Sequence, residues 1–154
     1  MPLRKIATPD SLKDWVGREI ALSDWVVITQ DRIHKFAEAT EDRQWIHLDR
    51  TRAEKESPFG TTIAHGFLTL SLISFLMKEG LEIERGVQRA INYGLNRVRF
   101  PAPVREGSKI RGRFTLASMK DLGDALELVC SAVVECEGSD KPCCVAEWIV
   151  RYYR

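Results

Sequence analysis

The chain has 154 residues, of which 44% are hydrophobic and 29% charged, as is typical of a globular protein with one domain-sized core. Its 23 basic and 22 acidic residues are interspersed and give a net charge of +1. This balance argues against nucleic acid or an anionic membrane surface as a partner.

No segment of the sequence indicates export or a membrane anchor. No apolar core follows the charged residues 1–5, and the longest apolar run, residues 66–77, is too short to cross a bilayer. Four cysteines have no zinc-site spacing: Cys130, Cys136, Cys143 and Cys144. We expect a cytoplasmic protein in which these thiols are reduced and buried.

The first 40 residues predict a strand and a helix. Residues 1–18 are a mixed lead-in, with Trp15 expected against the body of the protein. The apolar residues of 20–28 predict a strand, and Thr29 is a good N-cap for a helix over 30–40. The inward stripe of this helix is predicted to consist of Ile33, Phe36, Ala37 and Thr40.

A central helix is the next strong signal. Residues 41–48 are predicted to be a connection, followed by a short charged helix over 49–56 and a turn at 57–60. Residues 65–79 are apolar around the whole helical circumference, which predicts a helix surrounded by protein. Gly80 is expected to end it.

The second half changes to a period of two residues. Alternating apolar and polar side chains predict antiparallel strands over 108–118, 125–137 and 143–153, joined by turns at 122–124 and 137–142.

One further strand is predicted over 87–100, with apolar groups on both faces. A strand of this kind is covered on both sides, which indicates a subunit contact and a homodimer. Together the elements predict an α+β fold in which an antiparallel sheet wraps the helix over 65–79. We expect a single domain over 1–154, with segment 41–64 on its turn-rich surface.

The first candidate site is the pair Asp42 and His47, five residues apart. Taken alone, a surface aspartate and a structural histidine would be the simpler interpretation. Trp45 and Ile46 are bulky and apolar inside this polar connection, so we expect them to bury it. Burial raises the pKa of a carboxyl group and lowers that of a histidine, bringing both toward the range that acid–base catalysis requires.

The second candidate is Gly66, at the start of the central helix. A glycine admits a ligand close to the backbone, and the first free amides of a helix stabilise a developing oxyanion. A glycine kept only for tight helix–sheet packing is the alternative. The role of His65 stays open, because a histidine at a helix start is more often structural than catalytic.

Other candidates are weaker. His34 is expected to be a surface or packing residue. The histidine and carboxylate spacings match no known metal ligand set, and no G-x-S-x-G motif marks a serine nucleophile. Six basic residues are interpreted either as a solvated sheet face or as a contact for the phosphates of an extended cofactor: Arg97, Arg99, Arg105, Lys109, Arg111 and Arg113.

Three segments resemble the MaoC-like (NodN-type) dehydratases: Asp42-Arg-Gln-Trp-Ile-His47, the stretch 57–72 and the stretch 92–104. The resemblance extends from about Asp24 to Tyr152. It implies a hot-dog fold, in which an antiparallel sheet wraps a central helix, and membership of the (R)-specific enoyl-CoA hydratase group.

The resemblance assigns the catalytic Asp–His pair of that family to Asp42 and His47, and its oxyanion-stabilising amide to Gly66. The hydratase pattern has Asn-Pro where this chain has Gln44-Trp45. Gln44 is expected to orient the loop through its amide, whereas Trp45 cannot reproduce the fixed φ of proline. The sequence leaves open which member of the pair is the base.

The implied activity is that of a hydro-lyase of fatty acid metabolism, which adds water reversibly to trans-2-enoyl-CoA and gives (R)-3-hydroxyacyl-CoA. The partner is an acyl thioester of CoA or of acyl carrier protein. CoA arrives as part of the substrate, and no metal or other cofactor is implied. Two alternatives remain, a hot-dog acyl-CoA thioesterase and a non-catalytic acyl-thioester-binding protein, and the intact Asp42–His47 pair argues against the second.

Overall fold

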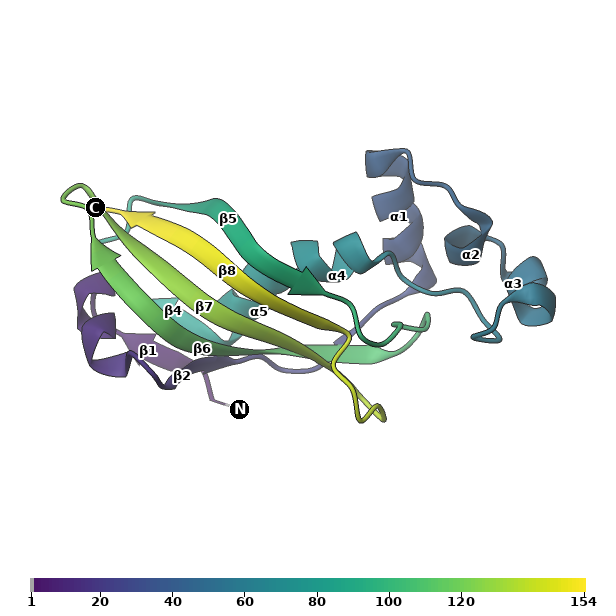
Figure 1. Ribbon diagram of the computed structural model, residues 1–154, viewed down its shortest axis with the longest axis horizontal. Coiled ribbons are helices and arrows are strands. Elements are labelled where there is room, and N and C mark those ends of the chain that lie inside the picture. Colours follow the sequence, from purple (N-terminus) through teal and green to yellow (C-terminus); the bar gives the residue numbers. More distant parts are fainter. Residues whose placement is uncertain (1) are drawn as a thin grey trace.

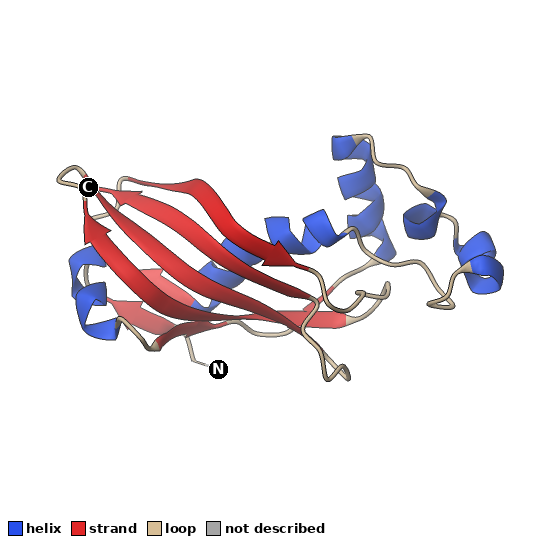
Figure 2. Cartoon of the chain, in the orientation of Figure 1, coloured by secondary structure: helices blue, strands red, loops and turns tan. Residues whose placement is uncertain are grey.

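The computed structural model describes residues 2–154, so Met1 of the predicted lead-in lies outside it. A curved antiparallel sheet wraps a central helix, and three further helices lie beyond one end of the sheet (Figure 1). Figure 2 shows that these three helices carry no strand between them. The α+β architecture predicted from the sequence is confirmed.

Six strands form the main sheet, in the order β2-β6-β7-β8-β5, with β3 also paired to β6. Their bounds are β2 (Glu19–Leu22), β3 (Val26–Val27), β5 (Arg89–Arg99), β6 (Lys109–Asp121), β7 (Ala125–Cys136) and β8 (Cys144–Tyr153). The period-two segments are confirmed as β6, β7 and β8. Phe114, Ala132 and Ala146 are paired across these three strands, and all are buried on the face toward the helix.

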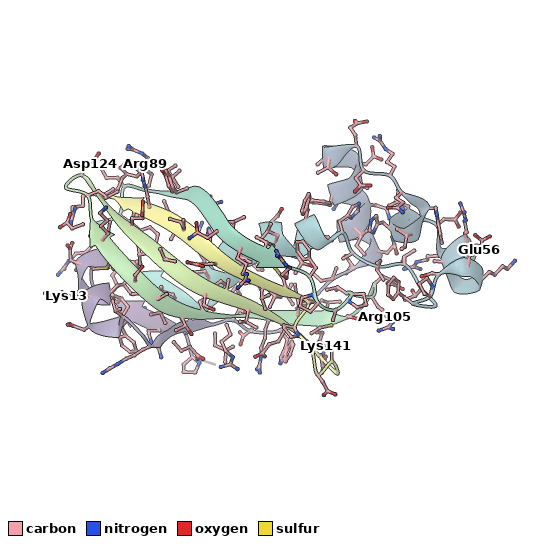
Figure 3. All side chains as sticks on the ribbon, viewed as in Figure 1. Lys13, Glu56, Arg89, Arg105, Asp124 and Lys141 are labelled. Carbon is pink, nitrogen blue, oxygen red and sulfur yellow. The ribbon has the colours of Figure 1, made fainter. Side chains whose placement is uncertain are left out.

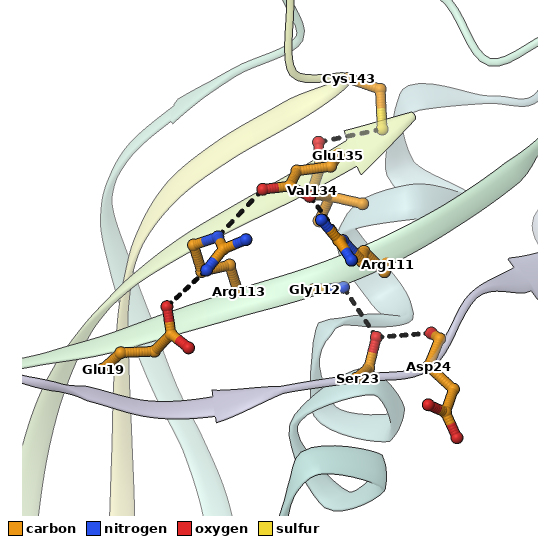
Figure 4. A network of polar contacts seen from close by, with 9 residues as sticks. All are labelled: Glu19, Ser23, Asp24, Arg111, Gly112, Arg113, Val134, Glu135 and Cys143. Carbon is orange, nitrogen blue, oxygen red and sulfur yellow. Dashed lines mark hydrogen bonds and ion pairs between the residues drawn. The ribbon is translucent and has the colours of Figure 1, made fainter. Parts of the chain in front are cut away.

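The strand predicted over 20–28 is interrupted at Ser23, which is buried. The Ser23 amide donates to the Gly112 carbonyl at 2.9 Å, and the Ser23 hydroxyl accepts from the Gly112 amide at 2.9 Å (Figure 4). This side chain replaces a backbone acceptor in the ladder, so β2 and β3 pair with β6 on either side of the break.

The central helix consists of α4 (Gly66–Ser71) and α5 (Ile73–Gly80). One side is buried against the sheet through Leu68, Ile73, Leu76 and Met77. The prediction that protein surrounds the whole helix is wrong for the isolated chain, because Phe67 is 68% exposed and Phe75 is 40% exposed.

Gly80 ends the helix, as predicted. The reason for glycine here is close packing. A Cβ atom at Gly80 would lie 2.7 Å from the backbone nitrogen of Leu22, so no larger residue fits between the helix end and β2.

Strand β5 is an edge of the sheet and pairs only with β8. A single chain does not provide the predicted cover on both faces, because three apolar side chains of this strand are exposed: Ile91, Tyr93 and Leu95. A long apolar edge strand exposes unpaired backbone groups and is a template for association with another chain.

The three outlying helices are α1 (Gln30–Thr40), α2 (Trp45–Leu48) and α3 (Arg50–Glu56). Thr29 caps α1 as predicted, by accepting a hydrogen bond from the Arg32 amide at 3.1 Å. The inward stripe is shorter than predicted: Ile33 and Ala37 are buried, Phe36 is half-buried and Thr40 is exposed. The connection predicted over 41–48 contains the single turn of helix α2.

The N-terminal segment closes the other end of the molecule. Strand β1 (Arg4–Ile6) pairs in parallel with β4 (Leu81–Ile83), and a 3₁₀ helix, η1 (Pro9–Trp15), follows. Trp15 is partly buried against the core, as predicted. No helix of the described residues is long and apolar enough to cross a membrane.

The four cysteines are free thiols and all are buried. Burial raises the pKa of Cys130 to about 12, so this thiol is unreactive. The expectation of buried, unpaired thiols is confirmed.

The six basic residues divide into those with a carboxylate partner and those without one, and Lys109 belongs to the first part through Glu137 at 3.8 Å. On the face of the sheet away from the helix, Arg113 contacts Glu19 at 2.6 Å and Glu135 at 2.9 Å, and Arg111 contacts Glu135 at 2.6 Å (Figure 4). These two arginines therefore belong to a sheet-surface ion-pair network. Three others have no carboxylate partner among residues 2–154: Arg97, Arg99 and Arg105.

Candidate active site

The position of His47 is fixed by a short pairing of two loops. The Ala64 amide donates to the Val104 carbonyl at 2.8 Å, and the Glu106 amide donates to the Thr62 carbonyl at 3.0 Å. Arg105, between the sheet and the outlying helices in Figure 3, donates from Nε to the Phe59 carbonyl at 3.2 Å. These bonds hold the segment before α4 in place.

Within that segment, the Ile63 carbonyl orients His47. The Nδ1–H of His47 donates to this carbonyl at 2.7 Å. Since a carbonyl can only accept, Nδ1 carries the proton, and the lone pair of the neutral ring lies on Nε2. The His47 carbonyl in turn accepts from the Gln30 side chain at 2.7 Å, which ties α2 to α1.

His47 is 8% exposed, and its environment favours the neutral ring. Burial lowers the pKa of His47 from its ordinary value, and this effect outweighs the hydrogen bond to Ile63, which raises it. The neighbouring His65 lowers this pKa and Asp42 raises it by smaller amounts. The predicted direction for the histidine is confirmed.

Asp42 lies beside His47, as predicted. One carboxylate oxygen of Asp42 and one nitrogen each of His47 and His65 lie within 4.8 Å of one another. The prediction that Trp45 and Ile46 bury the carboxyl group is wrong for the isolated chain, because Asp42 is exposed while only the histidine is buried. The side of Asp42 away from His47 is open to solvent or to a partner.

His65 is the residue whose role the sequence left open. It precedes α4, is 3% exposed, and its Nε2–H donates to the backbone carbonyl of Asp42 at 2.9 Å. Its ring stacks on that of His47, with centroids 3.8 Å apart and an interplanar angle of 21°. The side chain thus joins both members of the predicted pair.

Asp42, His47 and His65 are residue types that often bind metal ions, and they lie close enough together to do so. A metal ion binds a histidine nitrogen in the plane of the ring, at about 2.0–2.1 Å for zinc. Stacked rings direct their in-plane lone pairs along nearly parallel planes, so His47 and His65 cannot both point at one ion. In this arrangement the cluster is unsuited to a metal ion.

Gly66 opens α4, and its amide has no acceptor among the described residues. A free amide at a helix start can bind an oxyanion. A Cβ atom here would lie 3.1 Å from the Phe100 ring, so the packing alternative also has support. Phe100 is 39% exposed and contacts Phe67 at a centroid distance of 6.1 Å.

A cavity of about 180 Å³ lies between the central helix and β5. Its apolar lining includes Leu70, Ile73, Leu95 and Trp148. Leu70 is one helical turn after Gly66, so this lining residue lies on the same side of the helix as its first residue. Larger cavities, of about 420, 380 and 360 Å³, lie elsewhere, and neither histidine lines them or the cavity beside β5.

Comparison with known proteins decides the family. The family model for the MaoC like domain matches residues 12–135. The chain belongs to the MaoC-like family. The 3-hydroxyacyl-thioester dehydratase Z of Mycobacterium tuberculosis is 53% identical over 137 residues, which are 88% of this chain and 89% of the relative.

One further relative and one solved structure are also similar to the chain. Nodulation protein N of Rhizobium leguminosarum bv. viciae is 45% identical over 135 residues, 87% of this chain and 84% of that protein. The unliganded R-hydratase PhaJ1 from Pseudomonas aeruginosa superposes with a TM-score of 0.69 at 23% identity, covering 90% of this chain and 82% of the other. That likeness confirms the predicted hot-dog fold.

The MaoC-like chain departs from the hydratase pattern at two positions of its loop. The amide of Gln44 does not cap α2, so the expected orienting role is not supported. Trp45 takes the first helical position of α2, where proline is well tolerated. The Arg52 guanidinium lies over the Trp45 ring, 4.1 Å from its centroid. This contact restrains Trp45, where proline would be restrained by its fixed φ.

Proposed function

We propose that this protein is a hydro-lyase that hydrates trans-2-enoyl thioesters reversibly to (R)-3-hydroxyacyl thioesters, with Asp42 and His47 as its catalytic pair. The observation that carries the proposal is a buried, neutral His47 with a free Nε2 lone pair beside the Asp42 carboxyl group. Two hydrogen bonds of about 2.8 Å each can bridge groups at this separation through one water molecule.

In the hydration direction, His47 Nε2 takes a proton from this water while the water oxygen bonds to C3 of the enoyl group. Asp42, in its carboxylic acid form, gives the proton that C2 receives, and the proton taken up by His47 returns to the Asp42 carboxylate through water before the next turnover. Dehydration reverses both transfers, so that each group serves once as acid and once as base. The free lone pair on Nε2 supports the assignment of His47 as the hydration base.

Gly66 supplies the oxyanion-binding amide in this proposal. As C3 is attacked, negative charge accumulates on the thioester oxygen, and an unpaired amide aimed at that oxygen stabilises the enolate-like state. The acyl tail then extends along the central helix into the cavity beside β5, which Leu70 and Leu95 line. No metal or redox cofactor takes part, and CoA or acyl carrier protein enters with the substrate.

We also propose that the active unit is a homodimer of the cytoplasm that acts in fatty acid metabolism. Support for the dimer is the open edge of β5 together with the exposed helix side that carries Phe67 and Phe75. A second chain on this side would cover apolar surface and could enclose the exposed carboxyl group of Asp42. Support for a reducing compartment is the set of free thiols.

The direct test is product analysis with crotonyl-CoA. We expect mass spectrometry to find the hydrated thioester, and chiral analysis to find the (R) enantiomer. Release of free CoA thiol without hydration would instead identify a thioesterase. Binding of crotonyl-CoA without conversion would identify a non-catalytic acyl-thioester-binding protein.

A further inference from the structure

We propose that His65 is a positioning residue, which fixes the Asp42 loop and the His47 ring relative to each other through one hydrogen bond and one ring stack. The inference rests on the proposed function, because it concerns the geometry of that catalytic pair. It does not place His65 in contact with the substrate.

The first contact fixes Asp42. The Nε2–H of His65 donates to the Asp42 backbone carbonyl at 2.9 Å, across 23 residues of sequence. Asp42 follows Glu41, which ends α1 in a left-handed conformation with φ of 64°, so the chain turns sharply just before the catalytic residue. The hydrogen bond from His65 holds the backbone of the loop after this turn. It thereby fixes the position of the Asp42 Cα, from which the side chain extends.

The second contact fixes His47. The two imidazole rings stack at 3.8 Å, so His65 covers one face of the catalytic ring and excludes water from it. Phe36 of α1 lies against His65, with ring centroids 4.9 Å apart. The His65 ring therefore contacts both the half-buried ring of Phe36 and the ring of His47, and these contacts restrict its movement.

The polar chemistry of His65 argues against a role in packing alone. With the proton on Nε2, its Nδ1 is an acceptor, and this atom is buried without a partner among the described residues. A buried unpaired acceptor destabilises a fold. A phenylalanine would fill the same space without that cost, so the function of the imidazole is the hydrogen bond that it donates to Asp42.

Few charged groups surround the stacked rings of His47 and His65. The titratable groups that face the stacked pair are the two histidines themselves and Asp42. From α1 the neighbours are Phe36 and Gln30, neither of which titrates, and from the loop before α4 the neighbour is the Ile63 carbonyl. A change in the pKa of His47 in a His65 variant can therefore be attributed to His65, through the lost cover of the ring face and, by a smaller amount, through the lost electrostatic effect of this residue.

Three substitutions separate the two contacts. In His65→Gln, the amide nitrogen can reach the place of Nε2, so the donor is kept and the ring is lost. In His65→Phe, the ring is kept and the donor is lost. In His65→Ala both are lost. Leu76→Ala is the matched control, because Leu76 is fully buried in α5, which packs on β2 and β6.

We expect the donor to govern turnover. His65→Phe and His65→Ala should lower kcat for crotonyl-CoA hydration by about 10²-fold per folded molecule, since small displacements of catalytic groups have effects of this size. KM should stay within about threefold, and His65→Gln should recover kcat to within about tenfold of wild type. A folded His65→Phe protein with wild-type kcat would overturn the inference.

We expect the ring to govern the pKa of His47, which NMR titration measures without substrate. In His65→Ala and His65→Gln, water reaches the exposed ring face, and the pKa of His47 should rise toward its ordinary value of about 6.5. In His65→Phe the ring cover remains and only the smaller electrostatic effect of His65 is lost, so the pKa of His47 should rise less than in the other two variants. It should be unchanged in Leu76→Ala, even though Leu76→Ala lowers Tm.

The two arms distinguish failure of this inference from failure of the proposed function. A wild-type protein that does not hydrate enoyl thioesters would contradict the proposed function alone, and the NMR arm would still be decisive. An unmoved His47 pKa in a folded His65→Ala protein would overturn the stacking role whatever the activity.

Discussion

A histidine can act as a base only through a ring nitrogen that carries no proton and that water can reach. In His47 the Ile63 carbonyl binds the Nδ1–H, which leaves the lone pair on Nε2. Because burial lowers the pKa of His47, the neutral ring prevails at neutral pH. The residue is thus ready to accept a proton before the substrate binds.

This state predicts the pH dependence of hydration. The base must be neutral, so kcat/KM should fall on the acid side with the pKa of His47 in the free enzyme. Since that pKa is lowered, kcat/KM should stay level as the pH falls through about 6.5, the ordinary histidine value, and should decline only below it. Initial rates with crotonyl-CoA in buffers of constant ionic strength measure this profile.

Stability has to be followed in the same buffers. The unfolded chain takes up a proton on His47 at the ordinary value, whereas the folded chain does so only at lower pH. The contribution of His47 to the free energy of unfolding is therefore complete above about pH 6.5 and decreases below it. An acid limb at or above about pH 6.5 in fully folded protein would contradict the proposed base.

At the residue scale, the sequence predicts local pairs better than distant ones. Asp42 and His47 are five residues apart, so a single short loop brings them together. The bond from His65 to Asp42 spans 23 residues, and it forms only because the loop pairing before α4 places the helix start beside α2. The exposure of Asp42 was not predicted, because the half-buried Trp45 and Ile46 leave the Asp42 side of the loop exposed while His47 is buried.

At the scale of elements, the start of α4 has two reasons to be glycine. The free Gly66 amide suits an oxyanion, and the Phe100 ring occupies the space that a Cβ atom would need. Alanine at Gly66 would press on a half-exposed ring that can shift, while it relieves the entropic cost of glycine. The net change in stability is therefore small, and turnover is the informative measurement.

A double substitution separates the two reasons for Gly66. We expect Gly66→Ala to lower kcat at least tenfold per folded molecule, because the methyl group crowds the approach of the thioester oxygen to the amide, and loss of a donor at such sites costs about 10²–10³ in kcat. Phe100→Ala removes the ring contact. If crowding of the oxyanion is the cause, Gly66→Ala should be as harmful in the Phe100→Ala background as in wild type.

Full recovery of kcat in the double variant, relative to Phe100→Ala alone, would instead show that Gly66 serves packing. The oxyanion donor would then lie elsewhere, most reasonably in the loop over 59–63. Gly66→Val is a stricter variant of the same test, for which we expect no hydration and weaker binding of a saturated acyl-CoA.

The elements themselves were predictable where one physical signal dominated. The period of two in β6, β7 and β8 reflects a sheet with one buried face, and Thr29 marks the start of α1 by capping it. The break at Ser23 was not predictable, because it depends on a hydrogen bond to Gly112 on a strand 89 residues away. Local sequence does not encode that partner.

At the scale of the whole molecule, apolar surface is concentrated on one side. Ile91, Tyr93 and Leu95 of the open edge strand are exposed, and Phe67 contacts Phe100 beyond the end of that strand. The apolar circumference of the central helix predicted complete burial, which a single chain does not provide. A second copy of the chain accounts for both features, because it would cover the edge and the helix together.

Light scattering should find a particle of twice the 17.6 kDa chain mass at micromolar concentration. Leu95→Glu places a charge on the apolar edge, so it should shift the protein toward the monomer and lower hydration activity in parallel. Val16→Asp is the matched control. Val16 is an apolar residue of similar exposure, and it lies near β2, at the end of the strand order opposite to β5. A wild-type monomer with full activity would exclude the dimer as the active unit.

The central claim is that Asp42 and His47 act as one unit on one water molecule, and a double-mutant cycle tests it most directly. kcat for crotonyl-CoA hydration is measured for Asp42→Asn, His47→Ala and the double variant, with Glu54→Gln as a neutral exposed-acid control on α3. We predict losses of about 10²–10⁴ for each single variant, in folded protein, and a double variant little worse than either. Losses that multiply in the double variant, or single variants with near-wild-type kcat, would contradict the claim.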